Sequence, residues 1–302
     1  MKYKNINIVN IKEANAITHG GTFHADEVFA TVVLSKILPE VKLCRIFKIT
    51  NEIPKNAIIY DFGGGEFDHH IKGYNKMRPN GIKYSAFGLL WKKFGKELLK
   101  KVEKKEEVFY LFDKTFVSAI DAADNGQVIK NKVIPVITLS SVIATFNPNW
   151  DENEDYDENF LKAVEYAEKI FDNELKKAIS KINAKEKVEK AIEESKNGIL
   201  LLERYMPWQE QLFATKSQKA KEIYFVIFPS NRGGYNAVAV PDLDGYLWKK
   251  KLFPEEWAGL TGEKLAEVAG VKSASFCHLG RFIASAQTLE DILLMAQKAI
   301  EA

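Results

Sequence analysis

The sequence predicts a two-domain α/β protein whose first domain has a mainly parallel sheet and whose second domain is mixed α/β. The chain has 302 residues, which is more than one core usually contains. Its first part alternates short apolar runs with helical patterns, whereas hairpin patterns follow in the second part. The polar, acidic and proline-broken stretch 147–155 separates them. We therefore expect domains at 1–150 and 151–302.

A strand-loop-helix junction opens the first domain. We expect a strand over 14–18 that stops at His19 and a helix that runs on to Pro39. His24 and Asp26 lie in the junction between the two. Ligands usually bind at such junctions, because these lie at the carboxyl ends of the strands of an open α/β sheet.

Two further strands are expected at 43–49 and 58–61. The second strand delivers Asp61 to its carboxyl end, and three glycines after it let the backbone turn sharply toward Asp68-His69-His70. Four of the five histidines of the chain lie within its first seventy residues: His19, His24, His69 and His70. Paired imidazoles and carboxylates at the edge of a sheet are what a metal site needs.

Helical patterns fill the rest of the first domain. They cover 84–94, which Gly95 should end, then 108–124 and 134–146. The charged stretch 96–107 is typical of a solvated helix face.

Asp121 and Asp124 are three residues apart, before the helix stop Asn125-Gly126, and so share one face near the helix end. Capping or solubility would also explain these carboxylates, but the nearby histidines favour a role with metal or substrate.

The second domain is expected to begin with a long amphipathic helix over 160–195. A mixed pattern follows it, with strands at 199–203, 223–228, 235–240, 274–278 and 281–286, a helix at 261–269 and a final helix capped by 288–291. Two of the strand pairs are expected to form hairpins, around 229–234 and around 279–280.

Composition limits the cellular setting but not the partner. The net charge is +2, which neither requires nor excludes a polyanion. Cys44 and Cys277 form no CxxC pair, so a reducing compartment fits best. The start has no apolar signal core, and no later run is long enough to span a bilayer. We expect a cytoplasmic protein that contacts no membrane; a homo-oligomer is compatible with the sequence.

The clustered residues offer more nitrogen and oxygen ligands than one ion needs: His19, His24, Asp26, Asp61, Asp68, His69, His70 and Asp121. A set of carboxylates and imidazoles without thiolate suits Mn²⁺, Fe²⁺, Co²⁺ or Zn²⁺, and Asp61 could bridge two ions. Two such ions usually serve the hydrolysis of a phosphate ester or anhydride.

These motifs resemble those of known phosphoesterases. Asp68-His69-His70, the upstream histidine motif, Asp61 and Asp121 resemble the four-motif set of the DHH phosphoesterase superfamily. The longer stretches 19–27, 121–126, 253–260 and 276–283 resemble the melanocyte-proliferating-gene (Myg) family, over about residues 14–286. The first motif departs from the superfamily: four residues separate His19 from His24, where most members place an aspartate after three.

The resemblance implies an N-terminal DHH-type catalytic domain, two divalent ions and 3′-5′ exonuclease activity on RNA. Mn²⁺ is the expected ion, with Mg²⁺, Co²⁺ or Zn²⁺ as alternatives. By this resemblance, one ion is held by His19, His24 and Asp61, and the other by Asp26, Asp61, His69 and Asp121. His70 would face the scissile phosphate and Asp68 would orient the pair, while Asp124 joins them as a catalytic candidate.

The second domain would supply the substrate contacts. Arg232 with Gly233-Gly234, and His278 with Arg281, resemble the basic, glycine-containing elements with which related phosphoesterases hold a substrate. An arginine fork suits a non-scissile phosphate. An exposed hairpin-turn residue is the alternative for Arg232, and a hydrogen-bonded interior histidine is the alternative for His278.

Two other functions stay open at this point. The same metals could serve a small substrate such as a short oligonucleotide, a cyclic dinucleotide or pyrophosphate, because the chain lacks a strongly basic stripe. A non-catalytic metal-binding protein is disfavoured, since a structural site is closed by about four ligands.

Overall fold

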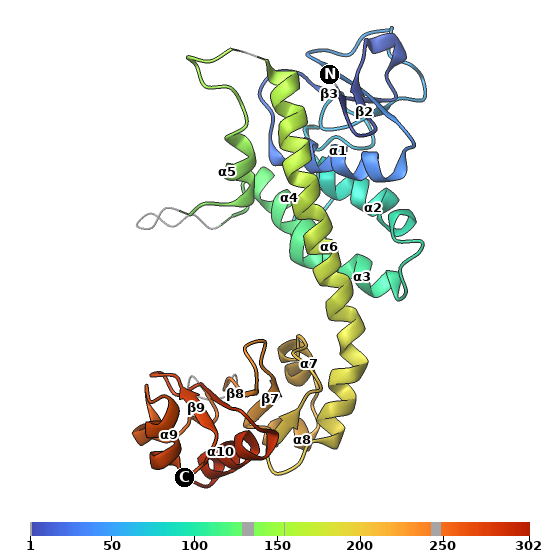
Figure 1. Ribbon diagram of the computed structural model, residues 1–302. Helices are drawn as coiled ribbons and strands as arrows, with labels where there is room; N and C mark the ends of the chain where they lie inside the picture. The colour runs from blue at the N-terminus through green and yellow to red at the C-terminus, as the bar shows by residue number, and fades with distance from the viewer. Residues whose placement is uncertain (1, 129–135, 154, 243–248) are drawn as a thin grey trace. The chain divides into compact units, whose positions relative to one another are not determined.

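The computed structural model describes residues 2–128, 136–153, 155–242 and 249–302 (Figure 1). The chain forms two compact units, Met1–Ile182 and Asn183–Ala302. The division falls inside the long helix α6 (Tyr156–Glu194), whereas the expected boundary at 150 precedes this helix. The hydrophobic positions of α6 explain the difference. Phe160 and Phe171 are buried in the core of the first unit, and Val188 and Ile192 are buried in a core of the second.

The first unit contains a five-stranded mixed sheet with the order β1-β2-β4-β3-β5. β1 (Lys2–Tyr3) pairs antiparallel with β2 (Ile6–Ile8), while β2–β4, β3–β4 and β3–β5 pair in parallel. β3 (Ala16–His19) was expected, and β4 (Val41–Ile46) and β5 (Ile58–Ile59) are shorter at their carboxyl ends than predicted. The sequence did not predict β1 and β2, because each is too short to show a hydrophobic period.

Two helices of the first unit pack against one another, α1 (Ala25–Ile37) and α2 (Ala86–Leu98), which Figure 1 shows side by side. The helix expected to end at Gly95 continues to Leu98, so that prediction was wrong. Gly95 is buried and allows close packing: a Cβ there would lie 2.8 Å from Trp91 Cδ2 and 2.9 Å from Phe109 Cε2. The glycine therefore serves a tertiary contact and does not stop the helix.

The segment that brings Asp121 to the site is helical, as predicted for 108–124. It comprises α3 (Lys105–Phe112), a π-helical turn (Asp113–Val117) and α4 (Ser118–Asp124). The predicted solvated helix over 96–107 is interrupted by turns before α3 begins. The helix expected at 134–146 is the shorter α5 (Leu139–Ala144), and the predicted start at 134–135 lies outside the described residues. A short 3₁₀ turn, η1 (Ile11–Glu13), precedes β3.

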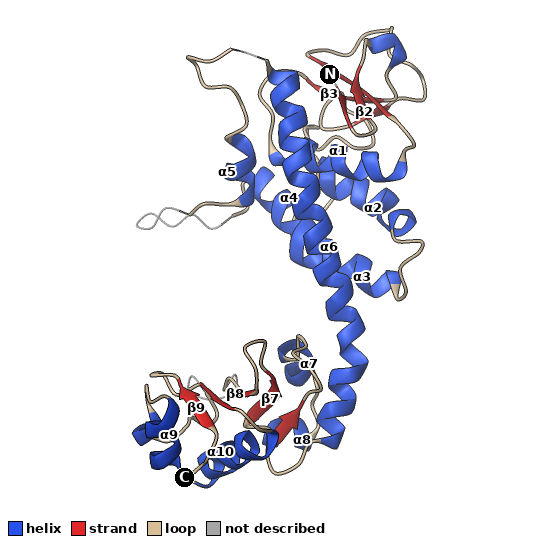
Figure 2. Ribbon diagram, viewed as in Figure 1, coloured by secondary structure: helices blue, strands red, loops and turns tan. Residues whose placement is uncertain are grey.

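The second unit has a mixed sheet with the order β6-β7-β8-β10-β9, which Figure 2 distinguishes from the helices by colour. Its strands are β6 (Ile199–Leu201), β7 (Phe225–Pro229), β8 (Tyr235–Ala239), β9 (Ala274–Cys277) and β10 (Ile283–Ala286). The two predicted hairpins, β7–β8 and β9–β10, are confirmed as antiparallel pairs. β6 pairs parallel with β7, and β8 pairs antiparallel with β10.

Local capping residues set one end of each of two helices in the second unit, as the sequence predicted. α9 (Gly262–Ala269) ends at Gly270, which has a φ of 61°, and α10 (Leu289–Glu301) begins at Thr288, whose hydroxyl accepts from the Asp291 N–H. α7 (Gln209–Ala214), α8 (Gln218–Glu222) and the 3₁₀ turn η3 (Glu255–Trp257) were not predicted. α10 packs against the sheet. None of the helices in the described residues is both long and apolar enough to cross a lipid bilayer.

Candidate metal centre

The candidate site lies at the carboxyl edge of the first-unit sheet. β3 ends in His19, and its parallel neighbour β5 leads through Tyr60 to Asp61, so both residues reach the same edge. Asp61 has a φ of 61°, a left-handed conformation that aspartate tolerates better than most residues. This turn sends the chain through the three glycines and back to the edge at His69.

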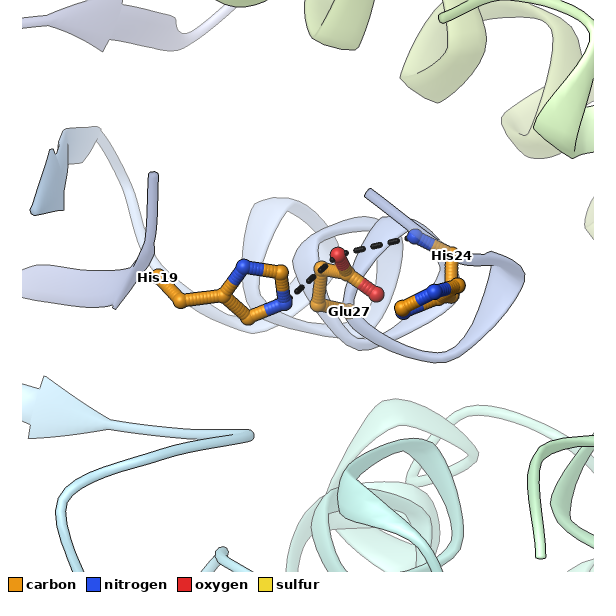
Figure 3. Close-up of side chains that lie close together, drawn as sticks. All are labelled: His19, His24 and Glu27. Carbon is orange, nitrogen blue, oxygen red and sulfur yellow. Dashed lines mark hydrogen bonds and ion pairs between the residues drawn. The ribbon is translucent and has the colours of Figure 1, made fainter. Parts of the chain in front are cut away.

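The first group of ligands comprises His19, His24 and Glu27 (Figure 3). His19 Nε2 lies 2.9 Å from Glu27 Oε1, and the backbone N–H of His24 donates to the same oxygen at 2.9 Å. His19 Nδ1 lies 3.2 Å from the Gly20 carbonyl oxygen. A hydrogen bond from Nδ1–H to that carbonyl leaves Nε2 as the ligand atom.

Glu27 is the member of this group that sequence reasoning did not single out. It is fully buried in the first turn of α1, where a carboxylate is rare unless it is paired, and here Oε1 has its partners in His19 and His24. The available signal was an acidic residue directly after Asp26 at the start of an otherwise apolar helix.

The second group comprises Asp61, His69 and His70, and the third comprises Asp26, His69 and Asp124. His69 belongs to both. Its Nδ1 lies 3.4 Å from Asp61 Oδ1 and 3.9 Å from Asp26 Oδ2, while its Nε2 lies 2.8 Å from Asp124 Oδ2. Within each group the ligand atoms lie within 4.8 Å of one another.

Asp61 connects the ligand groups, because its two oxygens face different histidines. Oδ2 lies 3.3 Å from His19 Nε2, whereas Oδ1 lies 3.4 Å from His69 Nδ1 and 3.6 Å from His70 Nδ1. Within the described part of the chain, Asp61 Oδ1, His69 Nδ1 and Glu27 Oε2 are buried and make no hydrogen bond. Buried polar atoms are normally paired, so these orphaned ligand atoms fit a metal ion.

Asp26 and Asp121 also bind the N-terminal end of α2. Asp26 accepts hydrogen bonds from the N–H groups of Ala86 and Phe87, each at 2.8 Å, and the Ser85 hydroxyl lies within hydrogen-bond distance of both carboxylates. A helix N-terminus favours negative charge, so α2 holds Asp26 in place.

Asp121 accepts hydrogen bonds inside the protein through Oδ1, whereas Oδ2 is buried without a hydrogen bond and pairs with Arg78 by charge. Oδ1 lies 2.6 Å from Ser85 Oγ and accepts from the Gly88 N–H at 3.0 Å, while Oδ2 lies 2.7 Å from Arg78 Nη1. A Cβ at Gly88 would overlap Asp121 Oδ2. Asp121 is in none of the three ligand groups found among the described residues.

Asp68 fixes the loop that carries the two histidines. Its carboxylate accepts from the N–H groups of Gly64, at 2.7 Å, and His70, at 2.8 Å, and lies 3.1 Å from His70 Nδ1. Burial opposes the charged form, but these N–H donors outweigh it and lower the pKa of Asp68. His70 is exposed and lines a cavity of about 610 Å³ with His19, His24, Asp61 and Asp68.

The centre holds an excess of buried negative charge. Burial, with Asp61 as the next cause, raises the pKa of Asp26 well above its ordinary value, and burial also raises the pKa of Glu27. Burial disfavours the His19 imidazolium, but Asp61 and Glu27 outweigh it and raise the His19 pKa to about 10. The carboxylates therefore favour any cation that enters the site.

The predicted substrate residues lie in two turns of the second unit. Arg232, Gly233 and Gly234 lie between β7 and β8, at the end of the β8–β10 pair where Tyr235 faces Ala286. His278 and Arg281 lie between β9 and β10, at the other end, where Val238 faces Ile283. The sheet therefore does not bring the two turns together.

The residues of these turns differ in their exposure to solvent and in their contacts with the rest of the unit. Arg232 and His278 are exposed, and His278 Nδ1 accepts from the Gly280 N–H at 2.8 Å, so His278 is not an interior histidine. Arg281 has a φ of 56° and donates to the Phe253 carbonyl at 3.4 Å. Gly234 packs so tightly that a Cβ would overlap the Ala286 carbonyl oxygen.

The chain resembles known proteins over most of its length. The model of the MYG1_exonuc family, described as an uncharacterised protein family (UPF0160), matches residues 15–300. The chain is 30% identical to the MYG1 protein YER156C of Saccharomyces cerevisiae, covering 94% of both chains. It is 30% identical to the human MYG1 exonuclease, covering 94% of this chain and 85% of the human one. No solved structure matches the chain. With a family match over nearly its whole length, the chain belongs to the MYG1_exonuc family.

Proposed function

We propose that this protein is a metal-dependent phosphodiesterase that removes nucleotides from the 3′ end of RNA with two divalent ions, Mn²⁺ being the expected one. The relatives named MYG1 exonuclease support a nuclease. The observation that most favours two ions is Asp61, whose two oxygens face two different histidine groups. We further propose that the first unit is a DHH-type catalytic domain.

In this proposal, His19, His24 and Asp61 would hold one ion, as the family resemblance implies, with Glu27, which groups with the two histidines, beside them. Asp26, Asp61 and His69 would hold the other, since His69 Nδ1 faces both carboxylates. Bound ions would polarise a phosphoryl oxygen and supply hydroxide at neutral pH. Asp121, expected among the ligands, is proposed here to hold Ser85 and the start of α2, because it belongs to none of the ligand groups of the described residues and contacts Arg78, Ser85 and Gly88.

The remaining side chains of the centre orient the ligands and the substrate. Asp124 accepts from His69 Nε2–H and so presents Nδ1 to the ion. Asp68 accepts from His70 Nδ1–H, which turns Nε2 of the exposed ring toward the cavity, where it can donate to a phosphate oxygen. In the second unit, Arg232, Gly233, Gly234, His278 and Arg281 would contact phosphates away from the reacting one.

The test is hydrolysis of 5′-labelled single-stranded RNA, single-stranded DNA, a cyclic dinucleotide and pyrophosphate with Mn²⁺, by the wild type and by Asp61→Asn. Asparagine tolerates the left-handed conformation of residue 61 but removes the shared charge, so the fold should persist. We expect RNA to shorten from its 3′ end and turnover to fall by about 10³-fold or more in the variant.

Two other results would change the assignment. Hydrolysis confined to the cyclic dinucleotide or pyrophosphate would keep the metal centre and replace RNA by a small substrate. Metal binding, measured by calorimetry, without hydrolysis of any of the four compounds would indicate a non-catalytic metal-binding protein.

A further inference from the structure

Three exposed apolar side chains lie on the segments that surround the candidate centre. Phe47 is 83% exposed, Ile49 47% and Ile71 41%. Ile71 lines the cavity of His70, and Ile49 packs against another lining residue, Gly63, whose Cβ would lie 2.8 Å from Ile49 Cδ1. Phe47 lines a second cavity, with Gly20, Gly21, Arg45, Asp155 and Asp157, and Gly20 directly follows His19. Single exposed apolar residues are common, but several of them beside polar cavities are typical of a binding surface.

The sheet places Phe47 beside the first metal ligand. β4 ends at Ile46, which pairs with His19 in parallel register, and the Gly20 N–H donates to the Ile46 carbonyl at 2.8 Å. Phe47 is the next residue. Neighbouring strands lie about 4.8 Å apart, so the backbone of Phe47 starts within one nucleotide's length of His19.

The Phe47 ring lies face down on the backbone of Gly20. Its atoms Cε2, Cζ and Cε1 would lie 3.2, 3.2 and 3.4 Å from a Cβ on Gly20. An edge-on ring would bring Cζ much nearer than its two neighbours, so these nearly equal distances require the flat face. Gly21 adds a second contact, since its Cβ position lies 3.2 Å from Cε1. Because the side chain is 83% exposed, its other face is open to solvent.

We propose that Phe47 is a stacking platform for a nucleobase next to the scissile phosphate, and that the substrate is therefore an unpaired 3′ end. This inference rests on the proposed exonuclease function. A flat aromatic face held on glycine backbone loses little entropy when a base stacks on it. Bases inside a duplex have both faces covered by their neighbours, whereas an unpaired terminal base can offer one.

Binding tests the platform without turnover. The full chain with Ca²⁺ in place of Mn²⁺ is titrated with a fluorescent single-stranded RNA and with the same RNA lacking its 3′-terminal or its penultimate base. The wild type should bind the intact RNA about 5- to 150-fold more tightly than one of the two abasic forms. Phe47→Ala and Phe47→Leu should lose this preference, and Phe47→Trp should keep it.

Hydrolysis with Mn²⁺ separates this inference from the proposed function. Phe47→Ala should raise KM for RNA by a similar factor, and a duplex with a blunt 3′ end should be a poor substrate for every variant. Tyr110→Ala is the matched control, since Tyr110 is an aromatic residue 61% exposed on α3. If the wild type hydrolyses RNA and Phe47→Ala has the same KM, the platform is overturned and the proposed exonuclease function is kept. A wild type that hydrolyses no nucleic acid would overturn the proposed function and the platform with it.

Discussion

At the scale of single residues, the proposed metal centre gives Asp124 the role of fixing which nitrogen of His69 faces an ion. The 2.8 Å contact between Asp124 Oδ2 and His69 Nε2 leaves Nδ1 facing Asp61. Asp124→Ala should therefore lower metal affinity by about 10- to 100-fold, as is usual when the partner of a ligating histidine is removed. Asp124→Asn, which keeps an acceptor, should lose less. Calorimetric titration with Mn²⁺ measures both, and unchanged affinity in Asp124→Ala would show that Asp124 does not orient His69 for an ion.

The sequence predicted that several residues of the candidate centre lie close together, but it did not predict which side chains they contact. His19, Asp61 and His69 could be grouped because parallel strands deliver their carboxyl ends to one edge. Glu27 was missed because its inward direction depends on where α1 starts. The partners of Asp121 come from segments 33 to 36 residues away, at Ser85 and Gly88, and no local pattern encodes such contacts.

At the scale of elements, one buried carboxylate ties α6 to the N-terminal strands. Glu168 accepts from the Tyr3 hydroxyl at 2.7 Å and pairs with Lys4 at 2.6 Å and with Lys36 at 3.3 Å. Burial opposes its charge, but Lys4, Tyr3 and Lys36 outweigh it, so the Glu168 pKa is lowered in the folded protein. A lowered pKa stabilises the fold above the unfolded-state pKa of about 4.3, and this stabilisation disappears as the pH falls through the folded-state pKa.

Glu168→Gln should therefore reduce the free energy of unfolding at pH 7 by about 1–3 kcal/mol, because partly buried charged donors lose their partner. The difference from the wild type should shrink below about pH 4. Urea unfolding at both pH values measures it. Glu165→Gln is the control, since Glu165 pairs with Lys169 on the exposed side of the same helix and should matter by less than about 1 kcal/mol. An equal loss at low pH would mean that packing, and not charge, fixes α6 to the strands.

Element boundaries were predictable where the residue that sets them acts locally. Thr288 caps α10 and Gly270 ends α9 through contacts within the helix itself. Gly95 failed as a stop because its small size serves the contact with Phe109, a neighbour in space that the helix pattern does not reveal.

At the scale of the whole molecule, the second unit should set the length of RNA that is bound well. Its two basic turns lie beyond opposite ends of the β8–β10 pair, whose four paired positions span about 10 Å along the strands. We therefore expect Arg232 and His278 to contact different phosphates. Arg232→Ala should raise KM for long RNA, with little change in kcat, and should affect a dinucleotide less.

Steady-state kinetics on single-stranded RNA of two to ten nucleotides would measure this dependence, with Arg232→Lys as the variant that keeps charge but loses the fork. If Arg232 holds a phosphate far from the reacting one, its removal costs binding that is the same in the ground and transition states, so KM alone rises. A large and equal fall of kcat for every length would instead place Arg232 at the reacting phosphate. The second unit would then contribute to the chemical step itself.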